Sequence, residues 1–435
     1  MDSAHLAQRL LSQEARGLLT RIDRLTSFAV RIPMVPAAAV SNEAQDGIER
    51  FLETGKKTLR ANVWAYLRWL ETEGSDAEPS EMQHRFTMLR LGFNVILEQF
   101  EIFSTALTQR SEHGTGVWLA GLDAVALDAL RVEGEYYEVP PVICYLDRGI
   151  GAAIRRARTR LPGGDPNPVA IIRVPRERMV GAGIGSSLIH EVGHQGAALL
   201  DVLPALRESL RGAARRDGPR RPLSPLWERW ISEIVADFWS VGMLGIGSTT
   251  GLMSVVSLPR YFVFRAPTDD PHPTPWIRVK LSCAMGKALY PDAHWDALSE
   301  LWGELYPVEH ASAPQRTKLE ALASEIPALV SLLVAQPIRR AGGRTLADVL
   351  PIRARQPAAL RGVFRDWRGN LEAAANARPS LVFAAFGQAR ADGVITPEEE
   401  SKTLATLLTD WALRTALETS ANCAAPARHW ATAVA

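Results

Sequence analysis

Cysteine is scarce in this chain of 435 residues. The three copies, Cys144, Cys283 and Cys423, are odd in number, lie far apart and form no Cys-x-x-Cys pair. Small disulfide-stabilised secreted domains and cysteine-based zinc sites both need closely spaced cysteines. The sequence therefore argues against a disulfide framework and against a Cys-type zinc site. It predicts a reduced, cytoplasmic setting.

An excess of charge of either sign is also missing. Lysine and arginine together number 49, against 48 aspartate and glutamate residues, which gives a formal net charge of +1. A chain without a basic balance has no overall electrostatic attraction to nucleic acid or to an anionic lipid surface. We therefore expect no nucleic-acid partner.

Long apolar runs are rare, and the N-terminal segment has charges throughout, so no classical signal peptide is visible. One uncharged run stands out, Phe238–Pro259, which is interrupted by four glycines and a Ser-Thr-Thr cluster. Such a run is a poor membrane span and predicts a buried helix, turn and helix. We do not expect membrane association, and a peptidase anchored through this run is kept as an alternative.

Helical periodicity dominates both ends of the chain. In the N-terminal part, apolar residues recur at helical spacing in Ala4–Ala29, Asp46–Leu70, Phe86–Leu107 and Gly116–Leu130. From His294 onward the pattern is helical again, with prolines as breaks. We expect a helical N-terminal region at 1–135 and a helical C-terminal region at 291–435. These flanks could bind a protein partner.

Between these ends the pattern changes to short β-branched runs. Val139–Leu146 and Val169–Val174 have the composition of buried strands, and the turn-rich LPGGDPNP lies between them. The basic segment Gly149–Leu161 predicts a helix with a solvated arginine face. Further on, Arg207–Pro225 is rich in Arg, Gly and Pro and predicts a flexible surface connection.

The segment with most chemical content reads SSLIHEVGHQGAALL. On a helix its two histidines, His190 and His194, lie one turn apart on the same face, where they can take two corners of a tetrahedral zinc site. Glu191 follows the first histidine, so its carboxylate can act as general base toward a water at the metal. Gly193 and Gly196 leave room beside a metal or a crossing helix.

A catalytic zinc bound by two histidines needs a third protein ligand and one open position. The strongly apolar helical segment Trp227–Ser240 offers Glu233 and, one turn later, Asp237. Carboxylates on such a helix are costly to bury without a cation or a hydrogen-bond partner. Glu228, which has more polar neighbours, is the main competitor for the ligand position.

HExxH followed by ExxxD on a later helix resembles the gluzincin branch of the zincin metallopeptidases. The resemblance implies that Glu233 is the third zinc ligand and that Asp237 accepts the free ring N–H of a zinc-bound histidine. It also implies a small sheet whose edge strand, here Val169–Val174, aligns an extended substrate through backbone hydrogen bonds. The metzincin branch is excluded, because its third histidine would stand at position 200, which is Leu.

The segment Asp269–Lys280, DDPHPTPWIRVK, resembles the His-Pro…Arg segment of CAAX-type membrane gluzincins and their soluble relatives. This resemblance implies that His272 stabilises the oxyanion of the tetrahedral intermediate. Arg278 would then be a supporting ion-pair or orienting residue, and Tyr261 is a rival for the role of His272. The resemblance to these peptidases covers about residues 140–281.

A second motif, QARADGVITPEE at Gln388–Glu399, has the end of an EF-hand calcium loop. Arg390 stands where such a loop needs an oxygen ligand, and an arginine there repels the ion. We expect a helix–turn–helix instead. Its second helix would start with Thr396 as cap, Pro397 as first residue and Glu399 as capping-box acid.

These observations predict an α+β, mostly helical protein with a zincin-like core at 136–290. We expect a zinc metallopeptidase that hydrolyses a peptide or protein substrate, with Zn²⁺ held by His190, His194 and Glu233. The alternative is a non-enzymatic helical scaffold or assembly protein with a structural or vestigial zinc site. Glu191 argues against that alternative, because a purely structural site has no use for a general base.

Overall fold

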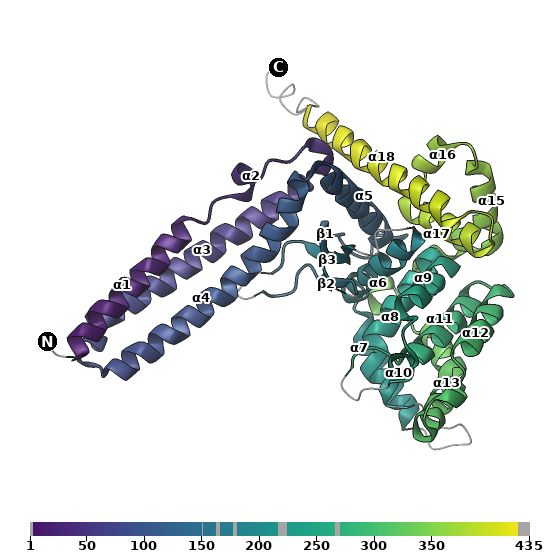
Figure 1. The fold of residues 1–435 in the computed structure, drawn as a ribbon, viewed down its shortest axis with the longest axis horizontal. Coiled ribbons are helices and arrows are strands. Elements are labelled where there is room, and N and C mark those ends of the chain that lie inside the picture. The colour runs from purple at the N-terminus through teal and green to yellow at the C-terminus, as the bar shows by residue number, and fades with distance from the viewer. Residues whose placement is uncertain are drawn as a thin grey trace. The chain divides into compact units, whose positions relative to one another are not determined.

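The computed structural model describes residues 3–149, 151–161, 166–176, 181–215, 224–265 and 270–424. These residues are mostly helical and include one small sheet, as Figure 1 shows, so the predicted α+β class is confirmed. The chain folds into two compact units. The first comprises 1–119, 140–145 and 155–171, and the second comprises 120–139, 146–154 and 172–435. The division into three regions that we predicted from the sequence stays a prediction.

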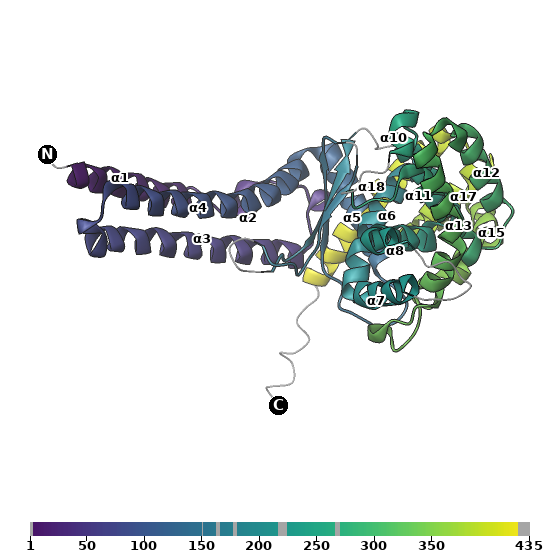
Figure 2. The same ribbon diagram turned by 90° about the horizontal axis from the view of Figure 1, so that it is seen from below.

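Three long helices form most of the first unit. They are α1 (Ser3–Asp23), α3 (Asn42–Glu71) and α4 (Pro79–Thr108), with the short α2 (Phe28–Arg31) between the first two. The three long helices lie side by side in Figures 1 and 2. Their apolar residues recur at helical spacing, and the stripes that result form one continuous core. The helices predicted for this part are confirmed, except that the predicted helix Ala4–Ala29 ends at Asp23 and its last residues belong to α2.

The sheet has three strands in the order β1-β3-β2, namely β1 (Val142–Asp147), β2 (Ala153–Arg155) and β3 (Ala170–Pro175). Both predicted strands are confirmed, but the prediction that Val169–Val174 forms the edge strand is wrong. This segment has a hydrogen-bonded strand on each side, so β1 and β2 are the edges.

The helix predicted at Gly149–Leu161 is also wrong. Part of that segment is β2, and Arg160 forms an isolated antiparallel bridge with Pro166. Arg158 has a positive φ of 63°, which no right-handed helix accommodates. Pairing with β3 satisfies the backbone of β2, and this non-local gain outweighs the helical tendency of the local sequence.

The second unit is built around α6 (Ala182–Leu199), α8 (Leu226–Leu244) and α9 (Ile246–Val256), which pack against one another. Two glycines of α6 allow α8 to approach closely. A Cβ on Gly193 would lie 2.8 Å from the Cβ of Trp239, and a Cβ on Gly196 would lie 2.4 Å from its indole ring. Their predicted role of leaving room for a crossing helix is therefore confirmed.

The surface connection predicted at Arg207–Pro225 is wrong over its first part. Helix α7 (Val202–Ala214) continues into it, because Val202, Leu206 and Leu210 recur every four residues and bury one face. Residues 216–223 of the predicted connection lie outside the described residues.

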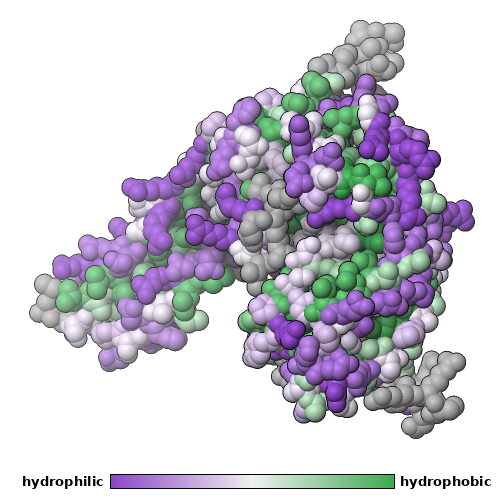
Figure 3. Space-filling model, turned by 45° about the vertical axis from the view of Figure 1, so that its right-hand side comes forward, coloured by the Kyte–Doolittle hydropathy of each residue, from purple (hydrophilic) through white to green (hydrophobic). Residues whose placement is uncertain are grey.

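The uncharged run Phe238–Pro259 forms the end of α8, a turn and α9, as predicted. Gly245 makes the turn with a positive φ of 57°, a conformation that glycine adopts without strain. No described helix is both long enough and apolar enough to cross a membrane. The face drawn in Figure 3 carries many hydrophilic side chains among its apolar ones.

The remaining helices complete the second unit, into which α5 (His113–Leu130) also extends. They are α10 (Arg260–Phe264), α11 (Pro275–Leu289), α12 (His294–Leu305), α13 (Ala313–Ala335), α14 (Leu346–Val349), α15 (Pro357–Trp367), α16 (Leu371–Ala375), α17 (Pro379–Ala391) and α18 (Pro397–Ala424). Helix α18 starts with the predicted capping box. The backbone N–H of Glu399 donates to Thr396 Oγ1 at 3.3 Å, and that of Thr396 donates to Glu399 Oε2 at 3.1 Å.

Candidate metal centre

Helices α6 and α8 bring together three side chains of the types that ligate metals. His190, His194 and Glu233 each offer one ligand atom, and these atoms all lie within 4.8 Å of one another. The Nε2 of His190 lies 3.2 Å from Glu233 Oε2, and the Nε2 of His194 lies 3.4 Å from Glu233 Oε1. Among the described residues this is the one such group. The three residues could therefore hold a metal ion.

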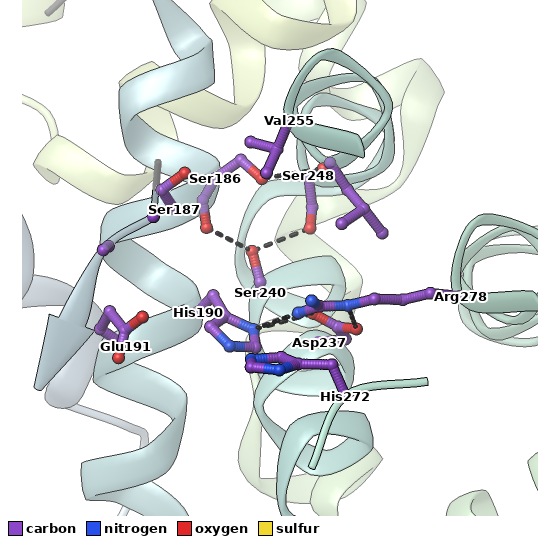
Figure 4. Close-up of a pocket in the computed structure, with 13 residues that line it drawn as sticks. Ser186, Ser187, His190, Glu191, Asp237, Ser240, Ser248, Val255, His272 and Arg278 are labelled. Atoms are coloured by element: carbon purple, nitrogen blue, oxygen red, sulfur yellow. Dashed lines mark hydrogen bonds and ion pairs between the residues drawn. The ribbon is translucent and has the colours of Figure 1, made fainter. Parts of the chain in front are cut away.

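The other ring nitrogen of His190 is fixed by a buried ion pair (Figure 4). Nδ1 donates to Asp237 Oδ1 at 2.8 Å. Arg278, on α11, donates from Nε to Asp237 Oδ2 at 2.7 Å and from Nη2 to Oδ1 at 2.8 Å. This bidentate pair holds the carboxylate in place. The carboxylate in turn holds the proton on Nδ1 and leaves Nε2 as the ligand atom.

The charges of this group perturb the pKa values of its members. Burial by itself lowers the pKa of His190, but the charge of Asp237 and hydrogen bonds to Asp237 and Glu233 outweigh burial and raise it to about 9. Burial raises the pKa of Glu233, but the two facing imidazoles lower it far below its usual range. Arg278 and His190 likewise overcome burial and lower the pKa of Asp237. A metal ion at this site would therefore have to displace a proton from His190.

His194 has a partner that the sequence did not reveal. The hydroxyl of Ser232 lies 3.3 Å from His194 Nδ1. When Nδ1 carries the proton and donates it to this hydroxyl, Nε2 is the free ligand atom on the side of Glu233. In the sequence, Ser232 is distinguished only by its place directly before the candidate ligand Glu233. That place alone does not predict a contact with His194.

His272 lies at the edge of the same group. Its Nε2 is 3.3 Å from Glu233 Oε2, and its side chain is half exposed. Asp270 accepts hydrogen bonds from both Nδ1 and the backbone N–H of His272, each at 2.9 Å. The sequence did not reveal Asp270 as a partner. Three imidazoles thus present Nε2 to one carboxylate, and each has its Nδ1 held by a separate polar side chain.

Glu191, which follows His190 on α6, lines with it a pocket that has a volume of about 100 Å³. The side chains of Asp237, His272 and Arg278 line it too. The structure therefore brings all the site residues predicted from the sequence into one place within the second unit. Their catalytic roles stay predictions.

Comparisons with known proteins supply no neighbour for this site. No family model, curated protein or solved structure matches the chain. The case for a function rests on the side chains themselves.

Two competing residues do not join the group. Glu228 pairs with Arg211, whose Nη2 lies 2.6 Å from Glu228 Oε1. Tyr261 has 71% of its surface exposed and its ring packs against Phe262. Glu233, and not Glu228, therefore lies at the candidate metal centre. Likewise His272, and not Tyr261, lies there.

Proposed function

We propose that this protein is a zinc-dependent metallopeptidase. The observation that carries the proposal is the convergence of His190, His194 and Glu233, together with a pocket that His190 and Glu191 both line. Two imidazoles and one carboxylate match the ligand set of catalytic zinc sites, which keep a fourth position open. A purely structural site is closed by a fourth protein ligand and needs no neighbouring base.

Two further side chains, Glu191 and His272, act directly in the proposed hydrolysis of a peptide bond. Zinc, when bound, would supply Lewis acidity toward water and toward the substrate carbonyl. Glu191 takes a proton from the water as its oxygen attacks the carbonyl carbon, and returns that proton to the leaving amine. His272 donates a hydrogen bond from Nε2 to the oxyanion, while Asp270 holds the ring in place through Nδ1.

Asp237 and Arg278 act through His190 and do not touch the substrate in this mechanism. Strand β2 takes the aligning role that the sequence assigned to β3. It is an edge of the sheet, and Gly151 and Ala152, which line the pocket, directly precede it. An extended substrate could align beside this edge strand.

The test uses the conservative variant Glu191→Gln, with Glu228→Gln as the matched control. Zinc content is measured by elemental analysis, and hydrolysis is measured with fluorescein-labelled casein. We expect both variants to keep about one zinc per chain and only Glu191→Gln to lose activity, by about 1,000-fold or more. If Glu191→Gln cleaves casein as fast as the unaltered protein, the proposed mechanism is wrong.

The position of His272 supports a second candidate, a scaffold protein with a structural zinc. Because His272 Nε2 lies 3.3 Å from Glu233 Oε2, this imidazole could serve as a fourth ligand. The absorption spectrum of the cobalt-substituted protein distinguishes the two, since it reports the ligands of the ion. A spectrum unchanged in His272→Ala supports the open, catalytic site, and loss of cobalt supports the scaffold.

A further inference from the structure

The pocket extends from the candidate metal centre to a cluster of buried serines. Ser186 on α6, Ser240 on α8 and Ser248 on α9 line it together with His190 (Figure 4). Ser186 precedes His190 by one helical turn and therefore lies on the same face of α6. Each of the three serines is at most 5% exposed. Three helices thus contribute these hydroxyls to the same end of the pocket, which Ser187 of α6 lines as well.

The protons of these three hydroxyls are already used within the protein. Ser248 Oγ donates to Ser240 Oγ at 2.8 Å, and Ser240 Oγ donates to the carbonyl of Ser186 at 3.3 Å. Ser186 Oγ donates to the carbonyl of Ser248 at 2.9 Å. A serine hydroxyl has one proton to donate and two lone pairs that accept. Toward a ligand, the hydroxyls of Ser186, Ser240 and Ser248 can therefore only accept hydrogen bonds.

The rest of the pocket limits the size and charge of a ligand. Leu252 and Val255 of α9 form an apolar wall, and the volume of about 100 Å³ holds a small side chain or a few water molecules. Arg278, a cation that lines the pocket, is neutralised by its bidentate pair with Asp237. The three serines and the apolar wall carry no charge, so this end of the pocket offers no counter-charge for a charged side chain.

We infer that this pocket binds a serine or threonine side chain of the substrate next to the scissile bond. Either side chain brings the hydroxyl proton that the cluster lacks, and its small carbon part fits between the apolar wall and His190. An alanine or valine at the same position would leave acceptors without a donor. The inference rests on the proposed function, because the metal centre places the scissile bond beside the pocket.

The test measures binding of four small probes to the zinc-loaded protein without any catalysis. The probes are the N-acetylated hydroxamates of threonine, valine, serine and alanine. The hydroxamate group binds zinc at an open position, which leaves the side chain to enter the adjoining pocket. Threonine and valine have the same shape, so their ratio of dissociation constants isolates the hydrogen bond. Titration calorimetry gives the four constants.

We expect threonine to bind about five-fold more tightly than valine, and serine more tightly than alanine by a similar factor. Equal binding within both pairs overturns the serine pocket while the open metal site stands. Tighter binding of the apolar member also overturns it. If no probe binds the zinc-loaded protein at all, the open metal position does not exist, and both this inference and the peptidase proposal fail.

Two variants on α9 locate the effect. Ser248→Ala removes one acceptor from the pocket, whereas Ser254→Ala removes an exposed hydroxyl that donates to the carbonyl of Thr250. We expect the threonine preference to fall to about two-fold or less in Ser248→Ala and to stay unchanged in Ser254→Ala. A preference that survives fully in Ser248→Ala contradicts the assignment. If Ser248→Ala does not fold, the comparison of the four probes on the unaltered protein still tests the inference.

Discussion

Two clusters of the second unit contain motifs typical of metal sites. They differ in the side chains that face their carboxylates. At the candidate metal centre, Glu233 faces the ring nitrogens of His190 and His194. In the loop that resembles an EF-hand, Asp392 accepts from Arg361 Nε at 2.9 Å and from Nη2 at 3.0 Å. Nearby, the fully buried Glu400 accepts from Arg390 Nη1 at 2.7 Å.

The difference lies in the partner that the protein supplies. An arginine is a permanent cation with no lone pair to offer, so it neutralises a carboxylate and leaves nothing for a metal. An imidazole can lose its proton and then becomes a ligand itself. Spacing of acidic residues alone therefore does not predict a metal site, and the identity of the counter-charge decides between the two clusters.

The largest effect that we expect is loss of the metal on substitution of one candidate ligand. In Glu233→Ala or His194→Ala, zinc content measured by elemental analysis should fall from about one per chain to near zero, because two ligands hold zinc poorly. The matched variant Asp392→Ala in the other cluster should keep its zinc. Zinc retained in Glu233→Ala would move the third ligand to Asp237 or His272.

A smaller effect is expected one step away from the metal. Asp237→Asn keeps the shape of the side chain but removes the charge that holds the proton on His190 Nδ1. Partners of this kind contribute about 10- to 100-fold to metal affinity. Competition with a chromophoric chelator measures the zinc dissociation constant. An affinity unchanged in Asp237→Asn would show that the ion pair with Arg278 does not support the metal centre.

The two candidate histidine ligands were predictable from the sequence because their geometry is local. His190 and His194 lie one turn apart on any helix, and the apolar residues around Glu233 already implied a buried helix with an unusual carboxylate. The partners of Nδ1 were not predictable for two of the three imidazoles. Ser232 and Asp270 belong to residue types that are common throughout the chain, and only the packed structure selects them.

The errors in the predicted fold have the same origin. The basic segment around Ala153–Arg155 has helical composition, yet its backbone pairs with β3, which lies 15 or more positions further along the chain. The edge of the sheet depends on strand order, which hydrophobic runs do not encode. The serine cluster joins three helices, so no single stretch of sequence contained it. Local periodicity predicted most helices and strands. Which of them pack or pair with one another depends on contacts between residues far apart in the sequence.

In the cluster that resembles an EF-hand, we expect a substitution to lower stability without any loss of metal. Arg390→Ala removes the guanidinium that faces the buried Glu400, which should lower the free energy of unfolding by about 2 kcal/mol. Urea denaturation measures this change, and zinc content should stay the same. Substitution of the exposed Arg365 on α15 by alanine is the control and should change stability little. An increase in thermal stability of the unaltered protein with millimolar calcium would contradict the assignment of this loop as a closed cluster.

The smallest expected effect comes from Ser232→Ala. The hydroxyl lies 3.3 Å from His194 Nδ1, a long contact with a neutral group, whereas Asp237 meets His190 at 2.8 Å with a full charge. A neutral hydrogen bond contributes about 0.5–1.5 kcal/mol, so zinc affinity should fall only about three- to ten-fold. The same chelator competition measures it, with Ser254→Ala as control. A loss as large as that in Asp237→Asn would mean that orientation of the ring, and not charge, controls metal affinity at this centre.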